Sequence, residues 1–208
     1  NPEKAKQILR LAKQTADLIQ DDFLQSQVYC AIATKQAKLN PEEAKQTADL
    51  IQYDYMQSKA YCAIAVEVAK SNPEEAKQIF ILAKQAAELI QDDEDQSDNY
   101  CAIATEQAKS NPEEAKQTAD LIQDAHWKQK TYCAIATIQA KSNPEEAKQT
   151  LRLAKQTADL IQSDFLKSLA YSAIAIEEAK SNPEKAKQIL RLAKQNVDLI
   201  QDVYMQSK

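Results

Sequence analysis

Two stretches of this sequence decide its fold: NPEKAKQILRLAKQTADLIQ at residues 1–20 and NPEEAKQTADLIQ at residues 40–52. They agree at both ends, and the longer one carries seven additional residues, ILRLAKQ, after its first AKQ. Seven residues make almost two turns of an α-helix, so the insertion lengthens a helix while rotating its apolar face by only about 20°. The two stretches therefore predict one amphipathic helix that exists in a short and a long form.

Both landmarks of this sequence recur with a spacing that alternates between 39 and 32 residues. Asn-Pro-Glu starts at residues 1, 40, 72, 111, 143 and 182, and YCAIA starts at 29, 61, 100 and 132 and returns as YSAIA at 171. Self-similarity with such a period is typical of solenoids and other repeat arrays. We expect a single solenoid domain over residues 1–208, with repeat units 1–39, 40–71, 72–110, 111–142, 143–181 and a partial unit 182–208.

Each unit has the pattern of a helical hairpin. Asn, Pro and Glu suit the cap and first turn of a helix, so all six Asn-Pro pairs mark the start of what we call an NPE helix, about 12 residues long in its short form and about 19 in its long form. A YCAIA helix follows a tight break. Because a residue before proline disfavours α conformation, each YCAIA helix ends near the next Asn-Pro. The expected ends are Lys38, Lys70, Lys109, Lys141 and Lys180, and the expected caps are Asp22, Asp54, Asp93 and Asp164.

The small residues of the two helices resemble those of the tetratricopeptide-type repeat over the whole chain. Ile64 and Ala65 match the residue pair of that family's first helix, and Ala76 matches the alanine that opens its second. The lack of glycine and the unit lengths depart from the family's 34-residue pattern. The resemblance implies an all-α fold, an α-solenoid of antiparallel helical hairpins in a right-handed superhelix. It also implies a concave groove that holds peptides or protein segments, and no catalytic residue.

Composition excludes several kinds of chemistry. The 208 residues include no glycine and one histidine, and the formal charge is −5. Phosphate-binding loops, dinucleotide motifs and nucleophile elbows require glycine, and nucleic-acid binders are expected to be basic. No apolar stretch approaches the roughly 20 residues of a membrane span. We therefore expect no enzyme activity, no cofactor, no metal, no nucleic acid and no membrane as partner.

The cysteines occupy one equivalent position in the YCAIA helices. They are Cys30, Cys62, Cys101 and Cys133, with Ser172 in the fifth unit. Stacked helices lie too far apart for these positions to form disulfides, so we expect small buried packing residues, with metal or intermolecular disulfide chemistry as the alternative. Free thiols indicate a reducing, cytoplasmic compartment. The chain opens at Asn1 without a leader, which indicates an excerpted or processed segment with no readable targeting signal.

One face of the YCAIA helices changes from unit to unit while the framework stays the same. Residues equivalent to 23, 27 and 34 share this face, and the only His and Trp of the chain lie next to each other near the start of one such helix. Nothing in the sequence near His126 supplies a nucleophile or an orienting group for catalysis. Partner contact and local packing remain the alternatives. The candidate partner-binding residues, which we call the variable face, are Phe23, Tyr55, Met56, Lys59, Glu94, Asp98, His126, Trp127, Lys130 and Phe165.

The acidic run at residues 92–98 is predicted to be a solvated, capped helix start, with an acidic patch for a basic partner as the alternative. The expected function is a non-catalytic scaffold that binds an unidentified protein or peptide along its superhelical surface. A structural array that self-associates through uncapped ends, whether a natural fragment or a designed repeat, is the main alternative. An RNA-binding helical repeat is the third, which the acidic charge disfavours.

Overall fold

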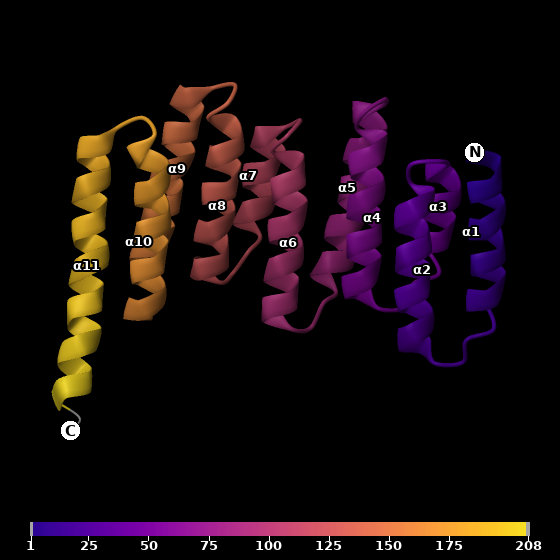
Figure 1. Cartoon of the computed structure of the whole chain (residues 1–208), viewed down its shortest axis with the longest axis horizontal. Helices are drawn as coiled ribbons and strands as arrows, with labels where there is room; N and C mark the ends of the chain where they lie inside the picture. Colours follow the sequence, from indigo (N-terminus) through magenta and orange to yellow (C-terminus); the bar gives the residue numbers. More distant parts are fainter. Residues whose placement is uncertain (1, 207–208) are drawn as a thin grey trace. The chain divides into compact units, whose positions relative to one another are not determined.

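The structure, a computed structural model, describes residues 2–206 and the side-chain environment of residues 2–199. Every regular element in this range is an α-helix, and no strand occurs in it. Within each of the two compact units described below, consecutive helices are antiparallel and joined by tight turns (Figure 1). The chain is therefore an all-α array of the α-solenoid type, as predicted.

The chain forms two compact units, of which the first ends at Glu106. It contains α1 (Pro2–Ala16), α2 (Asp22–Gln36), α3 (Pro41–Ala48), α4 (Asp54–Val68), α5 (Pro73–Glu88) and most of α6 (Asp93–Gln107). Here α2 packs against α1 and α3, and α4 packs against α3 and α5. Since α2 and α4 also contact each other, α2 joins its own hairpin to the next one.

The second unit begins at Gln107 and repeats this arrangement. It contains α7 (Pro112–Asp120), α8 (Ala125–Gln139), α9 (Pro144–Asp159), α10 (Asp164–Ala179) and α11 (Pro183–Gln206). Here α8 packs against α7, α9 and α10, and α10 packs against α9 and α11. The single solenoid domain over residues 1–208 stays a prediction.

The predicted starts of the NPE helices are confirmed wherever the structure describes them. The Asn40 side chain accepts a hydrogen bond from the Glu43 amide over 3.3 Å, and Pro41 opens the helix. The same cap forms at Asn72, Asn111, Asn143 and Asn182, while Asn1 lies outside the described residues. The YCAIA helices end one or two residues before the lysines predicted for them.

The NPE helices are shorter than predicted. The short ones, α3 and α7, have 8 and 9 residues, and the long ones, α1, α5 and α9, have 15, 16 and 16. The difference arises because the segment after Ala48 tightens: the amides of Leu50 and Ile51 bond to carbonyls three residues back, over 3.2 and 3.1 Å. Such a tightened turn ends an α-helix.

The last NPE helix also departs from the prediction. α11 continues to Gln206 as a 24-residue helix through the segment that turns in the other units. The tight break predicted for this unit is therefore wrong.

The predicted caps of the YCAIA helices are wrong by one residue. Asp21 caps α2 by accepting from the Leu24 amide over 2.8 Å, and Asp92, Asp124 and Ser163 do the same for α6, α8 and α10. The residues predicted as caps are instead the first residues of their helices, namely Asp22, Asp54, Asp93 and Asp164. At this position a carboxylate interacts favourably with the helix dipole. α4 has Tyr53 at the cap position, with no side-chain cap bond.

The apolar stripes form the core as expected. Ile64, Ile135 and Ile174, each the isoleucine of a YCAIA or YSAIA motif, are completely buried. Burial of such a side chain contributes about 1.5–3 kcal/mol. Cys62 and Cys133 are buried packing residues as predicted, whereas Cys30 and Cys101 are half-buried, and none of the four forms a disulfide. No described helix combines the length and the apolar character needed to cross a membrane.

Candidate functional site

In four of the hairpins, a tyrosine closes the turn between the two helices. Tyr29 donates its hydroxyl to Asp17 over 2.6 Å, and the same bond joins Tyr61 to Asp49, Tyr132 to Asp120 and Tyr171 to Asp159. Burial, followed by the bond to the carboxylate, raises the pKa of Tyr29 to about 12 and raises the pKa of the other three as well. These tyrosines therefore hold the scaffold as neutral phenols.

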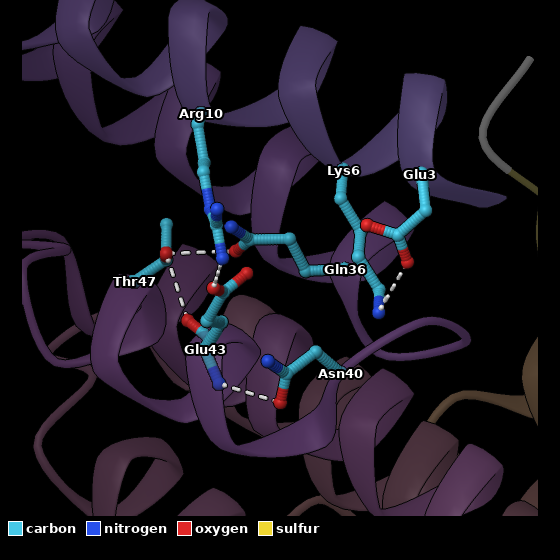
Figure 2. Close-up of polar contacts among 7 residues, drawn as sticks. All are labelled: Glu3, Lys6, Arg10, Gln36, Asn40, Glu43 and Thr47. Carbon is cyan, nitrogen blue, oxygen red and sulfur yellow. Dashed lines mark hydrogen bonds and ion pairs between the residues drawn. The ribbon is translucent and has the colours of Figure 1, made fainter.

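A buried polar pair joins successive hairpins. Gln36 on α2 points toward Thr47 on α3, whose hydroxyl donates to Gln36 Oε1 over 2.7 Å (Figure 2). Thr118 and Thr150 make the same bond to Gln107 and Gln139. Where α4 meets α5 the equivalent residues are Val68 and Ile79, both buried. These four pairs are matched, either polar with polar or apolar with apolar, which lowers the cost of burying them.

Ion pairs add an exposed layer above these buried pairs. Arg10 on α1 reaches Glu43 on α3 over 2.7 Å beside the Gln36–Thr47 bond (Figure 2). Lys45 on α3 pairs with Glu75 on α5 over 3.3 Å. Exposed pairs of this kind each contribute at most about 1 kcal/mol to the stability of the fold. Their main effect is therefore on the alignment of neighbouring hairpins.

In the first unit, the variable face presents aromatic rings and charges on α2 and α4. Phe23 is exposed, and its ring meets that of Tyr53 edge-on with centroids 5.3 Å apart. The Lys59 ammonium lies 5.6 Å from the ring centroid of the half-buried Tyr55, while Met56 is half-buried. The structure thus brings Phe23 together with an aromatic residue that the sequence analysis missed.

Glu94 and Asp98 form the acidic part of the same face on α6. Both are exposed, and the Asp92 side chain caps the helix by accepting from the Glu94 and Asp95 amides over 3.0 and 2.9 Å. The prediction of a solvated, capped helix start is confirmed. No group of acidic, cysteine or histidine side chains that could hold a metal ion occurs in the described part of the chain.

In the second compact unit, which begins at Gln107, the variable face is centred on Trp127. Its ring is half-buried, and the Lys130 ammonium lies 4.0 Å from the ring centroid, which is a close cation–π contact. His126 is also half-buried, and its Nδ1 is buried without a hydrogen-bond partner in the described residues. Phe165 on α10 is 61 % exposed. The Trp127 ring is therefore partly enclosed, with the positive charge of Lys130 above it, whereas Phe165 is exposed to solvent.

Two features of the structure were not predicted, although the sequence carries a signal for each of them. Tyr53 occupies a position where the other hairpins have Asp or Ser, and an aromatic residue at a cap position has no capping role. The tyrosine–aspartate bond has a constant spacing of twelve residues. In the third repeat unit, residues 72–110, this spacing places Glu88 opposite Tyr100, and no hydrogen bond joins those two side chains.

In comparisons with known proteins, no family model, no curated protein and no solved structure matches the chain. The resemblance to the tetratricopeptide-type repeat therefore rests on the residues of the chain itself. The helical repeat architecture is a property of the structure, whereas the role of each exposed residue must be argued from its geometry.

Proposed function

We propose that this chain is a non-catalytic helical-repeat scaffold, akin to tetratricopeptide-type repeats, that binds a protein or peptide through the variable face of its YCAIA helices. One observation carries the proposal: these helices bury an almost constant stripe of Tyr, Ile and Ala, while Phe23, Lys59, Glu94, Asp98, Lys130 and Phe165 are exposed. A framework that keeps its core and varies its surface suits recognition of a partner.

The chemistry of this surface supports a protein ligand. Tyr, Trp and Met are common anchors at protein interfaces because each covers a large area with few polar atoms. The lysines above the Tyr55 and Trp127 rings hold a positive charge beside each apolar surface. A ligand segment with an apolar side chain next to a carboxylate matches both sites. No cofactor and no nucleic acid enters this proposal.

A random peptide library selected on the unmodified chain, followed by titration of the enriched peptides against variants, tests the proposal. Trp127→Leu is the informative variant because the first and fifth units carry Leu24 and Leu166 at the equivalent position. It removes the ring under Lys130 and keeps an apolar side chain. We expect binding to fall about tenfold or more, as for a central aromatic anchor, with unchanged helicity.

Lys141→Ala is the matched control because Lys141 is exposed on the same hairpin and far from the ring in sequence. It should leave the affinity unchanged. The proposal is overturned when selection yields no binder, or when the enriched peptides bind Trp127→Leu and Tyr55→Leu as tightly as the unmodified chain.

Self-association is the second candidate, and one feature of α10 favours it. Phe165, Leu169 and Ile176 lie on one side of this helix and are 61, 47 and 63 % exposed. Three large apolar side chains on one face are more than scattered surface residues. The equivalents of Leu169 in the other units are the polar residues Gln27, Lys59, Asp98 and Lys130.

Sedimentation equilibrium at several concentrations decides between the two. A scaffold without self-association stays monomeric, whereas association through α10 gives a mass that rises with concentration and returns to the monomer in Leu169→Lys. That substitution introduces the residue that the second and fourth units carry at this position.

A further inference from the structure

Two helices of this chain open with the same fourteen residues and have different neighbours. NPEKAKQILRLAKQ occupies residues 1–14 and again residues 182–195. The second copy forms the start of α11, which packs extensively against α10. The first copy forms α1, which packs mainly against α2, its own hairpin partner. The chain thus contains one surface in a covered and an uncovered form.

The covered copy buries apolar side chains on one side that the first copy leaves accessible. Ile189 on α11 is 3 % exposed, whereas its counterpart Ile8 on α1 is 65 % exposed. Ala186 and Ala193 are buried, and their counterparts Ala5 and Ala12 are half-buried. The same side of α5 buries Ile79 beneath α4. Such an apolar side, covered in α5 and α11 by the preceding YCAIA helix, is left open in α1.

A groove marks the open side of α1. It has a volume of about 380 Å³ and lies between the helix and the C-terminal end of α2. Its lining residues are Ala5, Ile8, Leu9, Lys35, Lys38 and Leu39. The floor is apolar and the rim carries two lysines, so an apolar helix face edged by a carboxylate complements it.

A charge pair indicates which kind of helix fits. On α10, the Glu178 side chain is 2 % exposed, and Lys185 at the start of α11 donates to it. Lys4 is the counterpart of Lys185 in α1, and it has no carboxylate partner among the described residues. At the other junctions the residue equivalent to Lys185 is a glutamate, namely Glu43, Glu75, Glu114 or Glu146, and the residue equivalent to Glu178 is uncharged. The lysine and the glutamate of this pair, Lys185 and Glu178, therefore occur together at the junction of α10 and α11.

From these observations we infer that the open side of α1 is a docking surface for one kind of partner, an amphipathic helix with the surface of α10. Such a helix places an isoleucine equivalent to Ile174 over Ile8 and Ala5, and a glutamate one turn later beside Lys4. Helices with the surface of α4 or α8 bring Val68 or Gln139 to that position and leave Lys4 unpaired. This surface is separate from the variable face, so the inference is independent of the proposed function.

The test adds the partner helix in its natural register. A second copy of residues 143–181 is fused directly before Asn1, because this segment precedes the same fourteen residues in the chain itself. Hydrogen exchange is then measured at the amides of residues 5–12. We expect exchange to slow by about tenfold or more, since packing against a helix suppresses local opening.

Four substitutions define the contact. Ile8→Asp should abolish the protection, and Gln7→Asp should keep it, because Gln7 and its counterpart Gln188 are both exposed. Glu178→Lys in the fused copy should weaken the protection, and Lys4→Glu should restore it. Unchanged exchange in the fusion overturns the inference, as does protection that is indifferent to Ile8→Asp or to the exchanged charges.

A second measurement avoids dependence on the folding of the added hairpin. A synthetic peptide with the sequence of residues 164–181 is titrated into the unmodified chain while the same amides are followed. Saturable protection that Ile8→Asp removes supports the inference. Absence of protection at about 1 mM peptide, a concentration at which even weak association is visible, overturns it.

Discussion

The hydroxyl of Tyr29 donates a 2.6 Å hydrogen bond to the carboxylate of Asp17, which ties α2 to the turn that follows α1. The same bond recurs at three other hairpins and is missing at the third, where Glu88 stands opposite Tyr100. Because a glutamate has one more methylene group than an aspartate, its carboxylate does not take the same position. The chain thus contains an internal comparison for the value of this bond.

Tyr61→Phe should destabilise the chain, because it removes the hydroxyl that bonds to Asp49 and leaves the ring in place. We expect a loss of about 0.5–1.5 kcal/mol in the free energy of unfolding, measured by urea denaturation. Tyr100→Phe is the matched control, since Tyr100 makes no such bond, and it should cost clearly less. Equal costs for the two substitutions would contradict a specific role for the bond.

Alkaline pH should unfold the chain through its buried phenols. The folded-state pKa of Tyr29 is raised from 10.0 to about 12, chiefly by burial and further by Asp17. A raised pKa stabilises the fold fully below pH 10, and this contribution is lost as pH rises through about 12. Circular dichroism against pH should show the loss in that window, and Tyr29→Phe should make it shallower. An equally steep loss in Tyr29→Phe would exclude this tyrosine as a cause.

Thr150→Val should destabilise the second unit by about 1–3 kcal/mol because it leaves the buried carbonyl oxygen of Gln139 without its donor. The double variant Gln139→Val with Thr150→Val replaces the polar pair by an apolar pair like Val68 and Ile79, and it should recover most of that loss. A double-mutant cycle from denaturation curves measures the coupling of the two sites. Additive effects of the single substitutions would show that the pair is not coupled.

Thiol alkylation should be slowest at the buried cysteines. Burial raises the pKa of Cys133 to about 12, even though the Gln129 amide 3.0 Å from its sulfur opposes the shift. Since the thiolate is the reactive form, Cys133 and the buried Cys62 should react with iodoacetamide more slowly than the half-buried Cys30 and Cys101. Peptide mass spectrometry measures each rate, and equal rates in urea serve as the control.

Much of the fold could be predicted because repetition compares the chain with itself. The seven-residue insertion indicated a helix, and the observed lengths of α3 and α5 differ by close to that amount. The exact caps could not be predicted, because two acidic residues stand next to each other at Asp21 and Asp22 and either can cap a helix. Backbone geometry then selects the first of them.

The exposed surface was less predictable than the core. Comparison of the units identified positions that packing does not dictate, and Phe23 and Phe165 are indeed exposed. It did not reveal that the rings of Tyr53 and Phe23 meet edge-on, because the contact joins two hairpins and depends on how they approach each other. Spacing within a repeat predicts neighbours along one helix, and contacts between helices require the packed structure.

The turns of this chain carry a consequence for how its copies can change. Among the described residues no backbone angle φ is positive, and helices such as α3 and α5 end in right-handed conformations that every L-amino acid adopts freely. No turn between the described helices therefore requires glycine, and a side chain as bulky as that of Tyr53 can occupy a position where the chain reverses direction. Duplicated hairpins built in this way can change the residues of their turns without a conformational penalty. The turns can therefore vary in sequence as readily as the helices between them.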